Sequence, residues 1–210
     1  MEELTSIYPV AIEGEFARLR EFGPDDAEAL VACSQDQAVA RFMRWAPQTL
    51  NEAHMLVEKS SADAQKVPRT RYHLAGVDLE SGEVFSIIRL SVTSRENGRV
   101  RISLGVRPEL RGQGRAPAIW ADVAAFVFEQ LRAHRLYALI HEENRASLRF
   151  AEKMDLTFEG KQREYFFEDS VWKGVLLYST LRGEWEAMRA KRASLRRTKP
   201  GLGVRQGRHP

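Results

Sequence analysis

The stretch RVRISLGVRPELRGQGRAPAIW, residues 99–120, decides the fold of this chain. Apolar side chains occupy every second position over residues 100–106, which is the period of a half-buried β-strand. Pro108 ends the strand, because proline brings no backbone N–H to a neighbouring strand. Gly112 and Gly114 then form a tight turn before a helical pattern. The stretch therefore predicts a strand, a glycine turn and a helix in succession.

The glycine turn is the first indication of a ligand. The helical pattern begins at Ala116, with Pro117 in the first turn, where its missing N–H costs little. Glycines before a helix N-terminus let consecutive backbone N–H groups point into one concavity, and the helix dipole favours an anion there. The sequence therefore predicts a site for a ligand that carries a pyrophosphate. A dinucleotide-binding fingerprint is excluded because Pro117 replaces its third glycine, and the chain has no Gly-Lys-Ser/Thr of a Walker loop.

The composition indicates one soluble globular domain. The chain has 210 residues, of which 43% are hydrophobic and 29% are charged, and no apolar run approaches the roughly 20 residues of a membrane span. Cys33 is the single cysteine, which excludes a disulfide framework and a cysteine-based zinc site, and we interpret it as a core residue. The acidic N-terminus lacks the regions of a signal peptide. We expect a cytoplasmic protein with no membrane partner and no metal.

The net charge of +3 is unevenly distributed. Residues 186–210 carry eight basic side chains and one acidic side chain, whereas residues 1–185 are acidic overall. We therefore expect a single domain over residues 1–185 and a basic C-terminal helix or tail over residues 186–210, disordered in part. A basic tail favours RNA or ribosomes as partners, although a solvated terminus is the commoner case.

The remaining elements alternate in type along the chain. The patterns predict strands over residues 16–22, 71–79, 84–93, 136–140, 157–167 and 171–181, and helices from Pro24, over residues 36–66 with a break at Ala46 and Pro47, over residues 116–133 and over residues 144–154. Thr49 and Glu52 form a capping box after the break. Phe42, Met43 and Trp45 lie near it, where they either border a substrate cleft or pack in the core. The order predicts an α+β chain.

Four motifs occur in a fixed order along the chain. Val106 to Pro108 match a Val-x-Pro motif, and Arg111 to Ala116 match the turn motif Gln/Arg-x-x-Gly-x-Gly/Ala that follows it. Further along, Asn144 to Ser147 match Asn-x-x-Ser. The last motif is matched by Glu152, Lys153 and Phe158 to Lys161. In these motifs the chain resembles the GCN5-related N-acetyltransferases, the GNAT superfamily, and its RimJ/RimL-like branch, over residues 16–185. The resemblance implies an α+β fold with a mixed, mostly antiparallel, splayed central sheet of about seven strands flanked by about four helices.

The resemblance implies acetyl-coenzyme A as the acyl donor and co-substrate. The backbone amides expected to hold its pyrophosphate belong to Arg111, Gly112, Gln113, Gly114, Arg115 and Ala116; for the two arginines a solvated loop is the alternative. The pantetheine is expected to pair with the exposed strand edge from Leu104 to Val106, and an N–H near Val106 to polarise the thioester carbonyl. Asn144 either anchors the pantetheine or serves only as a helix cap.

The resemblance also implies direct attack of a neutral primary amine on the thioester in a ternary complex. This reaction needs a proton acceptor for the amine and a proton donor for the departing thiolate. Many relatives carry a tyrosine for the second role, seven residues after the motif asparagine, where this chain has Ala151. Ser147 is the alternative donor in this branch. The candidates for the base are Glu164 first, followed by His141, Glu142 and His73, and each also has an ordinary structural interpretation.

Two departures from the family pattern concern the acceptor. Arg101 stands where relatives often carry a glutamate, and Asp155 and Leu156 replace the common Gly-Phe. Exchange of a carboxylate for a cation disfavours a simple cationic amine and suits an anionic acceptor or acyl group. The acceptor stays open between a protein α-amine, as in ribosomal-protein acetylation, and a small amine such as an antibiotic. The resemblance also allows a homodimer.

Two other functions fit the same sequence. A non-catalytic member would bind a coenzyme A ester as a sensor or partner module, which the missing tyrosine and the unassigned base favour. An acyltransferase with a non-acetyl or carrier-protein-bound donor would use the same thioester, although the pyrophosphate turn argues against the carrier-protein form. The leading prediction is an acetyl-coenzyme A-dependent N-acetyltransferase.

Overall fold

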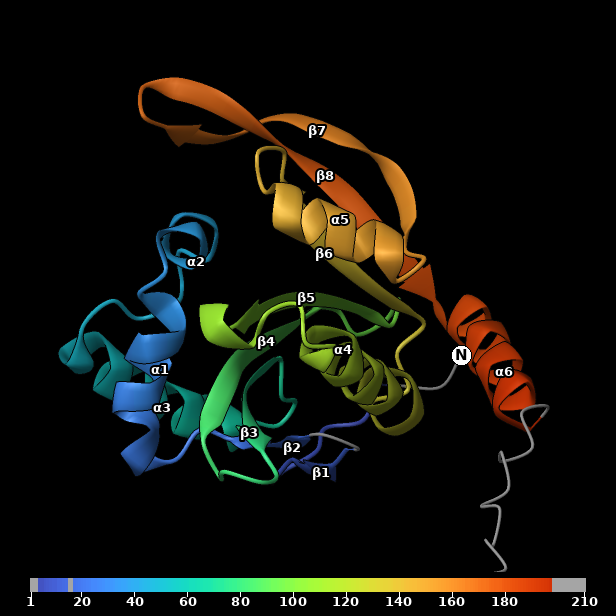
Figure 1. Cartoon of the computed structure of the whole chain (residues 1–210), viewed down its shortest axis with the longest axis horizontal. Helices are drawn as coiled ribbons and strands as arrows, with labels where there is room; N and C mark the ends of the chain where they lie inside the picture. The colour runs from blue at the N-terminus through green and yellow to red at the C-terminus, as the bar shows by residue number, and fades with distance from the viewer. Residues whose placement is uncertain (1–3, 15–16, 198–210) are drawn as a thin grey trace, which may run out of the picture.

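The computed structural model describes residues 4–14 and 17–197 (Figure 1). The strands are β1 (Ala11–Glu13), β2 (Ala17–Glu21), β3 (Arg71–Asp78), β4 (Val84–Ser94), β5 (Arg99–Val106), β6 (Arg135–His141), β7 (Thr157–Glu168) and β8 (Val171–Leu181). The α-helices are α1 (Ala27–Ser34), α2 (Gln37–Phe42), α3 (Leu50–Ala64), α4 (Arg115–Ala125), α5 (Arg145–Lys153) and α6 (Arg182–Arg197). Short 3-10 turns lie at Pro24–Asp26 and Pro108–Leu110, and a π-helical turn at Phe126–Gln130.

The described strands form one open sheet of eight strands in the order β1-β2-β3-β4-β5-β6-β8-β7. Neighbouring strands are antiparallel except β5 and β6, which run parallel and pair only through residues 99–101 and 135–137. Beyond these pairs the two strands separate (Figure 1). The predicted α+β fold with a splayed, mostly antiparallel sheet is confirmed. The described sheet has one strand more than the predicted seven, because the short β1 pairs with β2.

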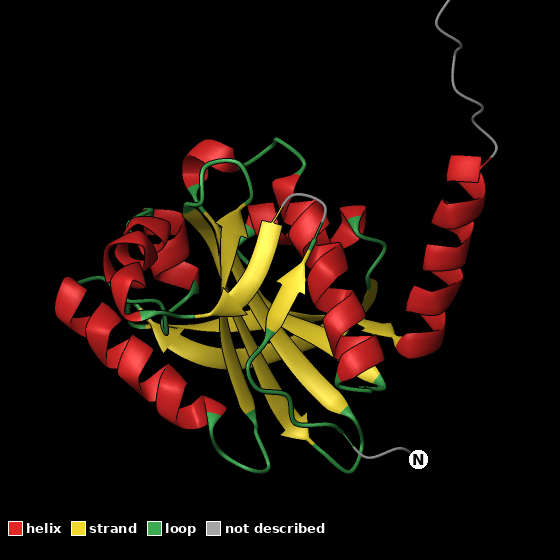
Figure 2. Ribbon diagram, turned by 90° about the horizontal axis from the view of Figure 1, so that it is seen from below, coloured by secondary structure: helices red, strands yellow, loops and turns green. Residues whose placement is uncertain are grey.

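Helices cover both faces of the sheet (Figure 2). On one face Leu30 of α1 and Val57 of α3 form an apolar cluster with Ile87 of β4. On the other face Ile119 of α4 belongs to a larger core with Ile102 of β5. Successive side chains of a strand point to opposite faces, and β3 and β4 contribute to both clusters. The gap between β5 and β6 therefore lies between two helical layers.

The strand, turn and helix predicted over residues 99–120 are confirmed as β5, the glycine turn and α4. The predicted break between two helices is also confirmed, since α2 ends at Phe42 and α3 begins after Thr49. The Thr49 hydroxyl accepts a 3.2 Å hydrogen bond from the backbone N–H of Glu52, as in the predicted cap. The first predicted strand begins at Ala17 in the structure, and Phe16 lies outside the described residues.

The helix predicted over residues 116–133 differs in the structure. The α-helix ends at Ala125, and a π-helical turn follows in which Leu131 N–H donates to the carbonyl of Phe126 at 2.9 Å. Phe126, Val127 and Phe128 are consecutive and all buried. The wider π turn rotates neighbouring side chains through a smaller angle, which lets all three face the core.

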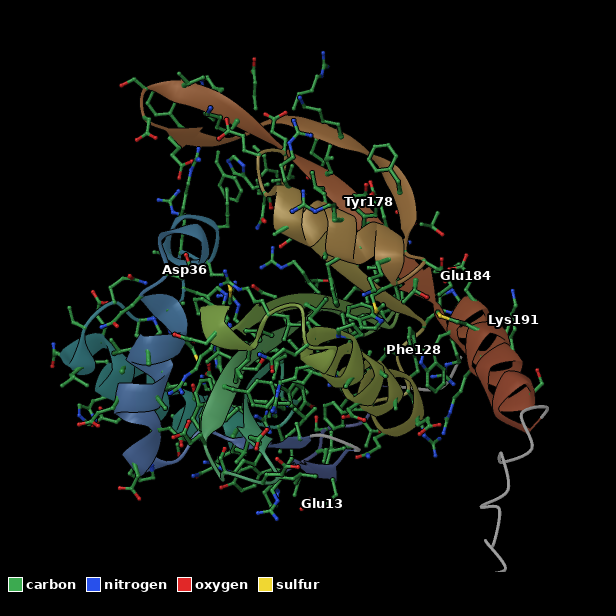
Figure 3. All side chains as sticks on the ribbon, viewed as in Figure 1. Glu13, Asp36, Phe128, Tyr178, Glu184 and Lys191 are labelled. Atoms are coloured by element: carbon green, nitrogen blue, oxygen red, sulfur yellow. The ribbon has the colours of Figure 1, made fainter. Side chains whose placement is uncertain are left out.

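The C-terminal helix α6 begins at Arg182, before the predicted boundary at residue 185. Trp185 is buried, and its ring lies 5.3 Å from that of Phe128, which is labelled beside α6 in Figure 3. The start of α6 therefore packs on the domain. The end of the domain at residue 185 stays a prediction. The predicted disorder concerns residues 198–210, which lie outside the described residues. No helix in the described part is long and apolar enough to span a membrane.

Cys33 on α1 is a core residue, as predicted. Its side chain is fully buried, and burial raises the pKa of the thiol to about 11. The thiolate is the nucleophilic form of cysteine, so Cys33 stays an unreactive thiol near neutral pH.

Candidate active site

A cleft of about 660 Å³ lies between the diverging strands β5 and β6. Ile102 and Trp120 line it on the side of α4, and Ser103 and Trp45 line it on the side of α2 and α3. Ile102 and Ser103 are neighbours on β5 and point to opposite faces of the sheet. The cleft therefore passes through the sheet and opens on both faces.

One wall of the cleft is the open backbone edge of β5. The N–H of Arg107 donates to the carbonyl of Phe85 at 2.9 Å, so the odd-numbered residues of β5 turn their backbone groups toward β4. Leu104 and Val106 then turn theirs to the other side, where β6 pairs no further than Tyr137. The strand edge predicted at Leu104 and Val106 thus faces the cleft, ready to pair with an extended ligand.

The glycine turn leads from this edge into α4. Gly112 and Gly114 have φ angles of 78° and 80°, a region that favours glycine, and a Cβ at either position would meet no atom within 4 Å. Gly114 is the N-cap of α4 and provides no side-chain cap for the helix. The first N–H groups of α4 are thus uncovered by a capping side chain, and the site suits an anion.

The two arginines of the turn bind carboxylates of the protein. Arg111 forms an ion pair with Asp36, which Figure 3 labels beside α2, and its Nε donates to the carbonyl of Val106 at 3.1 Å. Arg115 forms an ion pair with Asp78 of β3. These bonds fix the turn to the rest of the domain, so the backbone N–H groups are left as the donors for an anion. Arg111, Gly112 and Ala116 line the cleft, whereas Gln113, Gly114 and Arg115 lie outside its lining.

The opposite wall is formed by the start of α5. The side-chain oxygen of Asn144 accepts a 3.1 Å hydrogen bond from the backbone N–H of Ser147, so the predicted helix cap is confirmed. Asn144 and Ser147 both line the cleft. Ala151 lines it one turn further along the helix and is buried. A serine hydroxyl is therefore present in the cleft, and the usual tyrosine is replaced by a methyl group.

His141 lies at the end of β6 and lines the cleft on the side that faces α2. Its Nδ1 accepts a 3.1 Å hydrogen bond from the N–H of Glu143, which places the proton of the neutral ring on Nε2. That nitrogen lies 3.6 Å from a carboxylate oxygen of Glu168, and both atoms are buried without a hydrogen-bond partner. The ring stacks on Phe166 at 6.4 Å. The structure thus brings together an imidazole and a carboxylate that are far apart in sequence.

Glu164, the first sequence candidate for the base, is exposed and does not line the cleft. It has a φ of 52° and lies where the pairing of β7 with β8 shifts between Gln162 and Phe166. Sequence reasoning missed Glu168, because it assigned this residue to the hairpin turn. The signal for Glu168 in the sequence would have been an acidic residue two positions after an aromatic residue that lines the cleft, here Phe166.

The two remaining sequence candidates have structural partners. Glu142 forms an ion pair with Lys161 and accepts a 2.6 Å hydrogen bond from the N–H of Gly174, and the Lys161 bond in particular holds the pKa of Glu142 below its usual value. His73 is buried beneath Trp45, with ring centroids 5.6 Å apart. Burial and, to a smaller degree, the charge of Arg89 lower the pKa of His73 to about 4. Neither side chain lines the cleft.

The residues near the helix break contribute to the cleft as well as to packing. Phe42, Met43 and Trp45 all line it, and Met43 is also buried in the second apolar cluster. The indole N–H of Trp45 donates to the hydroxyl of Ser103 at 3.0 Å. The side of the cleft that faces α2 is therefore largely aromatic.

The family of this chain follows from comparison with known proteins. The model of the Acetyltransferase (GNAT) domain matches residues 17–157. The chain therefore belongs to the GNAT acetyltransferase family, an acyltransferase family, as its motifs predicted.

Individual relatives agree with this assignment. “Uncharacterized N-acetyltransferase YoaA” of Bacillus subtilis is 24% identical over 177 residues, which cover 84% of this chain and 98% of the relative. “Putative ribosomal N-acetyltransferase YdaF” of the same organism is 24% identical over 183 residues, 82% of this chain and 94% of the relative. A crystal structure of a GCN5-related N-acetyltransferase from Brucella melitensis has a TM-score of 0.77 at 22% identity and covers 92% of this chain and 88% of that one. The last comparison supports the fold.

Proposed function

We propose that this protein transfers the acetyl group of acetyl-coenzyme A to a primary amine by direct attack in a ternary complex. The observation that carries the proposal is the open edge of β5 beside the glycine turn. The edge offers backbone groups to an extended chain of amides, and the turn offers N–H groups to a phosphate. Coenzyme A combines these two features in one molecule. No cluster of potential metal ligands occurs among the described residues.

We take the glycine turn, the edge of β5 and the start of α5 as the donor side of the cleft. Each residue there has a proposed role. The amides from Arg111 to Ala116 would hold the pyrophosphate, and Asn144 would face the pantetheine from α5. The N–H groups of Leu104 and Val106 would pair with the pantetheine and polarise the thioester carbonyl. Ser147 would donate a hydrogen bond to the departing sulfur, in place of the absent tyrosine.

We take the side of the cleft that faces α2 as the acceptor side, and there we assign proton removal to the pair of His141 and Glu168. The amide of Glu143 occupies Nδ1 of the imidazole, so the ring presents its Nε2–H to the carboxylate. The ring therefore orients the carboxylate. Glu168 lies beside His141 and outside the described lining of the cleft, so it would take the proton of the amine through a bridging water. Arg41 lies 3.7 Å from an oxygen of the same carboxylate. His141 is thus a positioning residue.

This assignment is tested by comparing Glu168→Gln with Glu164→Gln. Release of free thiol from acetyl-coenzyme A is measured against a panel of amines and N-terminal peptides, and the products are identified by mass. Loss of a general base lowers kcat by about 100-fold or more, so Glu168→Gln should show this loss with the KM for acetyl-coenzyme A unchanged. Glu164→Gln should stay within about twofold of the parent. The reverse result would restore Glu164 as the base.

A second function is favoured by Ala151 and by the absence of a carboxylate from the described lining of the cleft. The protein would then bind a coenzyme A ester as a sensor without turning it over. Calorimetry would show tight binding of acetyl-coenzyme A, while no amine of the panel would release thiol. Thiol release with any acceptor excludes this function.

The acceptor class includes a protein N-terminus. This possibility rests on the name of one relative, “Putative ribosomal N-acetyltransferase YdaF”, and on the basic α6. The N-terminal peptides in the panel test it directly.

A further inference from the structure

The acceptor side of the cleft carries positive charge without a matching negative charge. Apart from Arg111, which pairs with Asp36, three arginines line the cleft, and no aspartate or glutamate is present in its described lining. Two of the arginines, Arg89 and Arg101, come from the neighbouring strands β4 and β5 and are both partly buried. They share the sheet face of Ser103 and Trp45, because residues at alternate positions of a strand share a face. They are thus well placed to act together.

Arg89 is held in position by its surroundings. Its guanidinium lies 4.8 Å from the centre of the Trp45 ring, a cation–π geometry. Trp45 is itself fixed by its 3.0 Å hydrogen bond to Ser103. Burial first, and then the charges of Arg101 and Arg71, lower the pKa of Arg89 to about 10. Arg89 is therefore still a cation at neutral pH, and it lies close enough to Arg101 to be affected by its charge.

The neighbouring side chains do not neutralise these two cations. On β3, Arg71 is the residue that binds the nearby carboxylate, with 3.7 Å between its guanidinium and Asp63. His73 lies directly across from Arg89 in the sheet and is held neutral by its low pKa. Neither Arg89 nor Arg101 has an ion pair among the described residues. Partly buried cations without a partner are unfavourable, and an anionic ligand would remove this cost.

The ligand of these arginines is distinct from the phosphates of the donor. The proposed phosphate-binding turn follows the end of β5, whereas Arg101 lies near the start of this strand, in the last residue pair with β6. About 17 Å of extended chain separate Arg101 from Val106. Two candidate anion sites therefore lie at opposite ends of one strand.

We propose that Arg89 and Arg101 bind a carboxylate of the acceptor, so that the substrate is an amine that also carries a carboxylate and an apolar body. The apolar body would lie against Phe42, Trp45 and Phe166. This inference rests on the proposed acetyl transfer, and it narrows the acceptor. A free amino acid with an apolar side chain has this chemistry, and so does a peptide with an acidic residue near its N-terminus.

The first test compares acceptors that differ only in the carboxylate. L-Phenylalanine, L-phenylalaninamide, phenethylamine and an N-terminal peptide with an acidic second residue are each assayed for thiol release with acetyl-coenzyme A. Kcat/KM should be at least tenfold higher for one of the two carboxylate-bearing acceptors than for the amide and the amine. Which of the two reacts distinguishes the small molecule from the peptide. Transfer to all four at equal rates would overturn the inference and leave the acetyl transfer standing.

Variants then show which residue causes the preference for a carboxylate-bearing acceptor. Arg101→Gln should abolish the preference for the carboxylate, and Arg101→Glu should reverse it in favour of phenethylamine. Arg99→Gln is the matched control, because Arg99 lies on the same strand and is exposed outside the cleft lining. It should keep the preference of the parent. Urea unfolding checks that each variant is folded.

A binding measurement tests the inference even if no amine is acetylated. Calorimetry with N-acetyl-L-phenylalanine and with its amide compares the two ligands without turnover. The carboxylate form should bind at least five times more tightly to the parent and to Arg99→Gln, and equally with the amide to Arg101→Gln. Equal affinities in the parent would overturn the inference, whereas absence of thiol release in the first test would overturn only the proposed function.

Discussion

His73 shows at the scale of one residue how the fold determines a charge. Its side chain is 4% exposed and lies between the rings of Phe22 and Trp45. Burial lowers its pKa to about 4, from 6.5 in a solvated imidazole. The unfolded chain therefore takes up a proton at a pH where the folded chain does not, and the acceptor side of the cleft keeps a neutral ring behind its arginines.

The pH dependence of unfolding follows from this shift. Above pH 6.5 both states hold a neutral ring, so the group has no effect. Between pH 6.5 and pH 4 only the unfolded state gains the proton, which lowers the free energy of unfolding by about 3 kcal/mol. Urea unfolding at a series of pH values should show this loss in the parent and not in His73→Gln. His54→Gln, which replaces an exposed histidine of α3, should behave like the parent.

The candidate base shows what the sequence can and cannot reveal about single residues. His141 was among the predicted candidates because it ends a buried strand, and it does line the cleft. Glu164 was preferred on a motif, but the backbone of β7 has a positive φ there and the pairing shifts. Such a shift breaks the alternation of side chains. Which carboxylate of β7 lies beside His141 therefore depends on a local irregularity that sequence periodicity does not contain.

At the scale of elements, the glycine turn before α4 combines an unusual backbone with an exposed helix end. A side chain at Gly114 would meet no neighbour, so the effect of a substitution would come from its positive φ. Gly82, in the turn between β3 and β4, has a φ of 73° and equally open surroundings. The two positions therefore differ in their distance from the proposed pyrophosphate site and hardly in their backbone.

This similarity provides a matched test. Gly114→Ala and Gly82→Ala should each lower the free energy of unfolding by about 1 kcal/mol. Only Gly114→Ala should also weaken the binding of coenzyme A, by about tenfold, because the strained turn moves its N–H groups away from the phosphates. Calorimetry with coenzyme A measures this difference. Equal losses of affinity in both variants would contradict a pyrophosphate site at the turn.

The elements with strong local signals were the ones predicted from the sequence. The alternation of β5, the glycine turn and the cap at Thr49 all reappear in the structure. The short β1 was missed because three residues carry no period, and it exists only through its pairing with β2. The π turn was missed because it results from packing against the core. Both β1 and the π turn depend on tertiary contacts, which local sequence patterns do not report.

At the scale of the whole molecule, the sheet consists of two parts joined through the few residue pairs between β5 and β6. Strands β1 to β5 form one part, and β6, β8 and β7 form the other. The cleft lies between them, so a ligand that fills it contacts both parts. The resemblance predicted this splay, whereas the periodicity of the strands alone could not.

Coenzyme A should therefore stabilise the protein as a whole. At 100 times its Kd a ligand adds about 2.7 kcal/mol to the stability of the folded state, which raises Tm by about 5–10 °C in a chain of this size. Hydrogen exchange should show new protection at the amides of Leu104 and Val106, which face the cleft. A rise in Tm without protection at these amides would place the coenzyme elsewhere.

The gap between β5 and β6 also has a consequence for how substrates would bind and products would leave. It opens on both faces of the sheet, so a ligand can reach the cleft from either face. In the proposed reaction, the donor would enter from the α4 face and the acceptor from the α2 face. Neither substrate would then block the other, and the order of substrate binding and product release would be set by affinities rather than by steric obstruction.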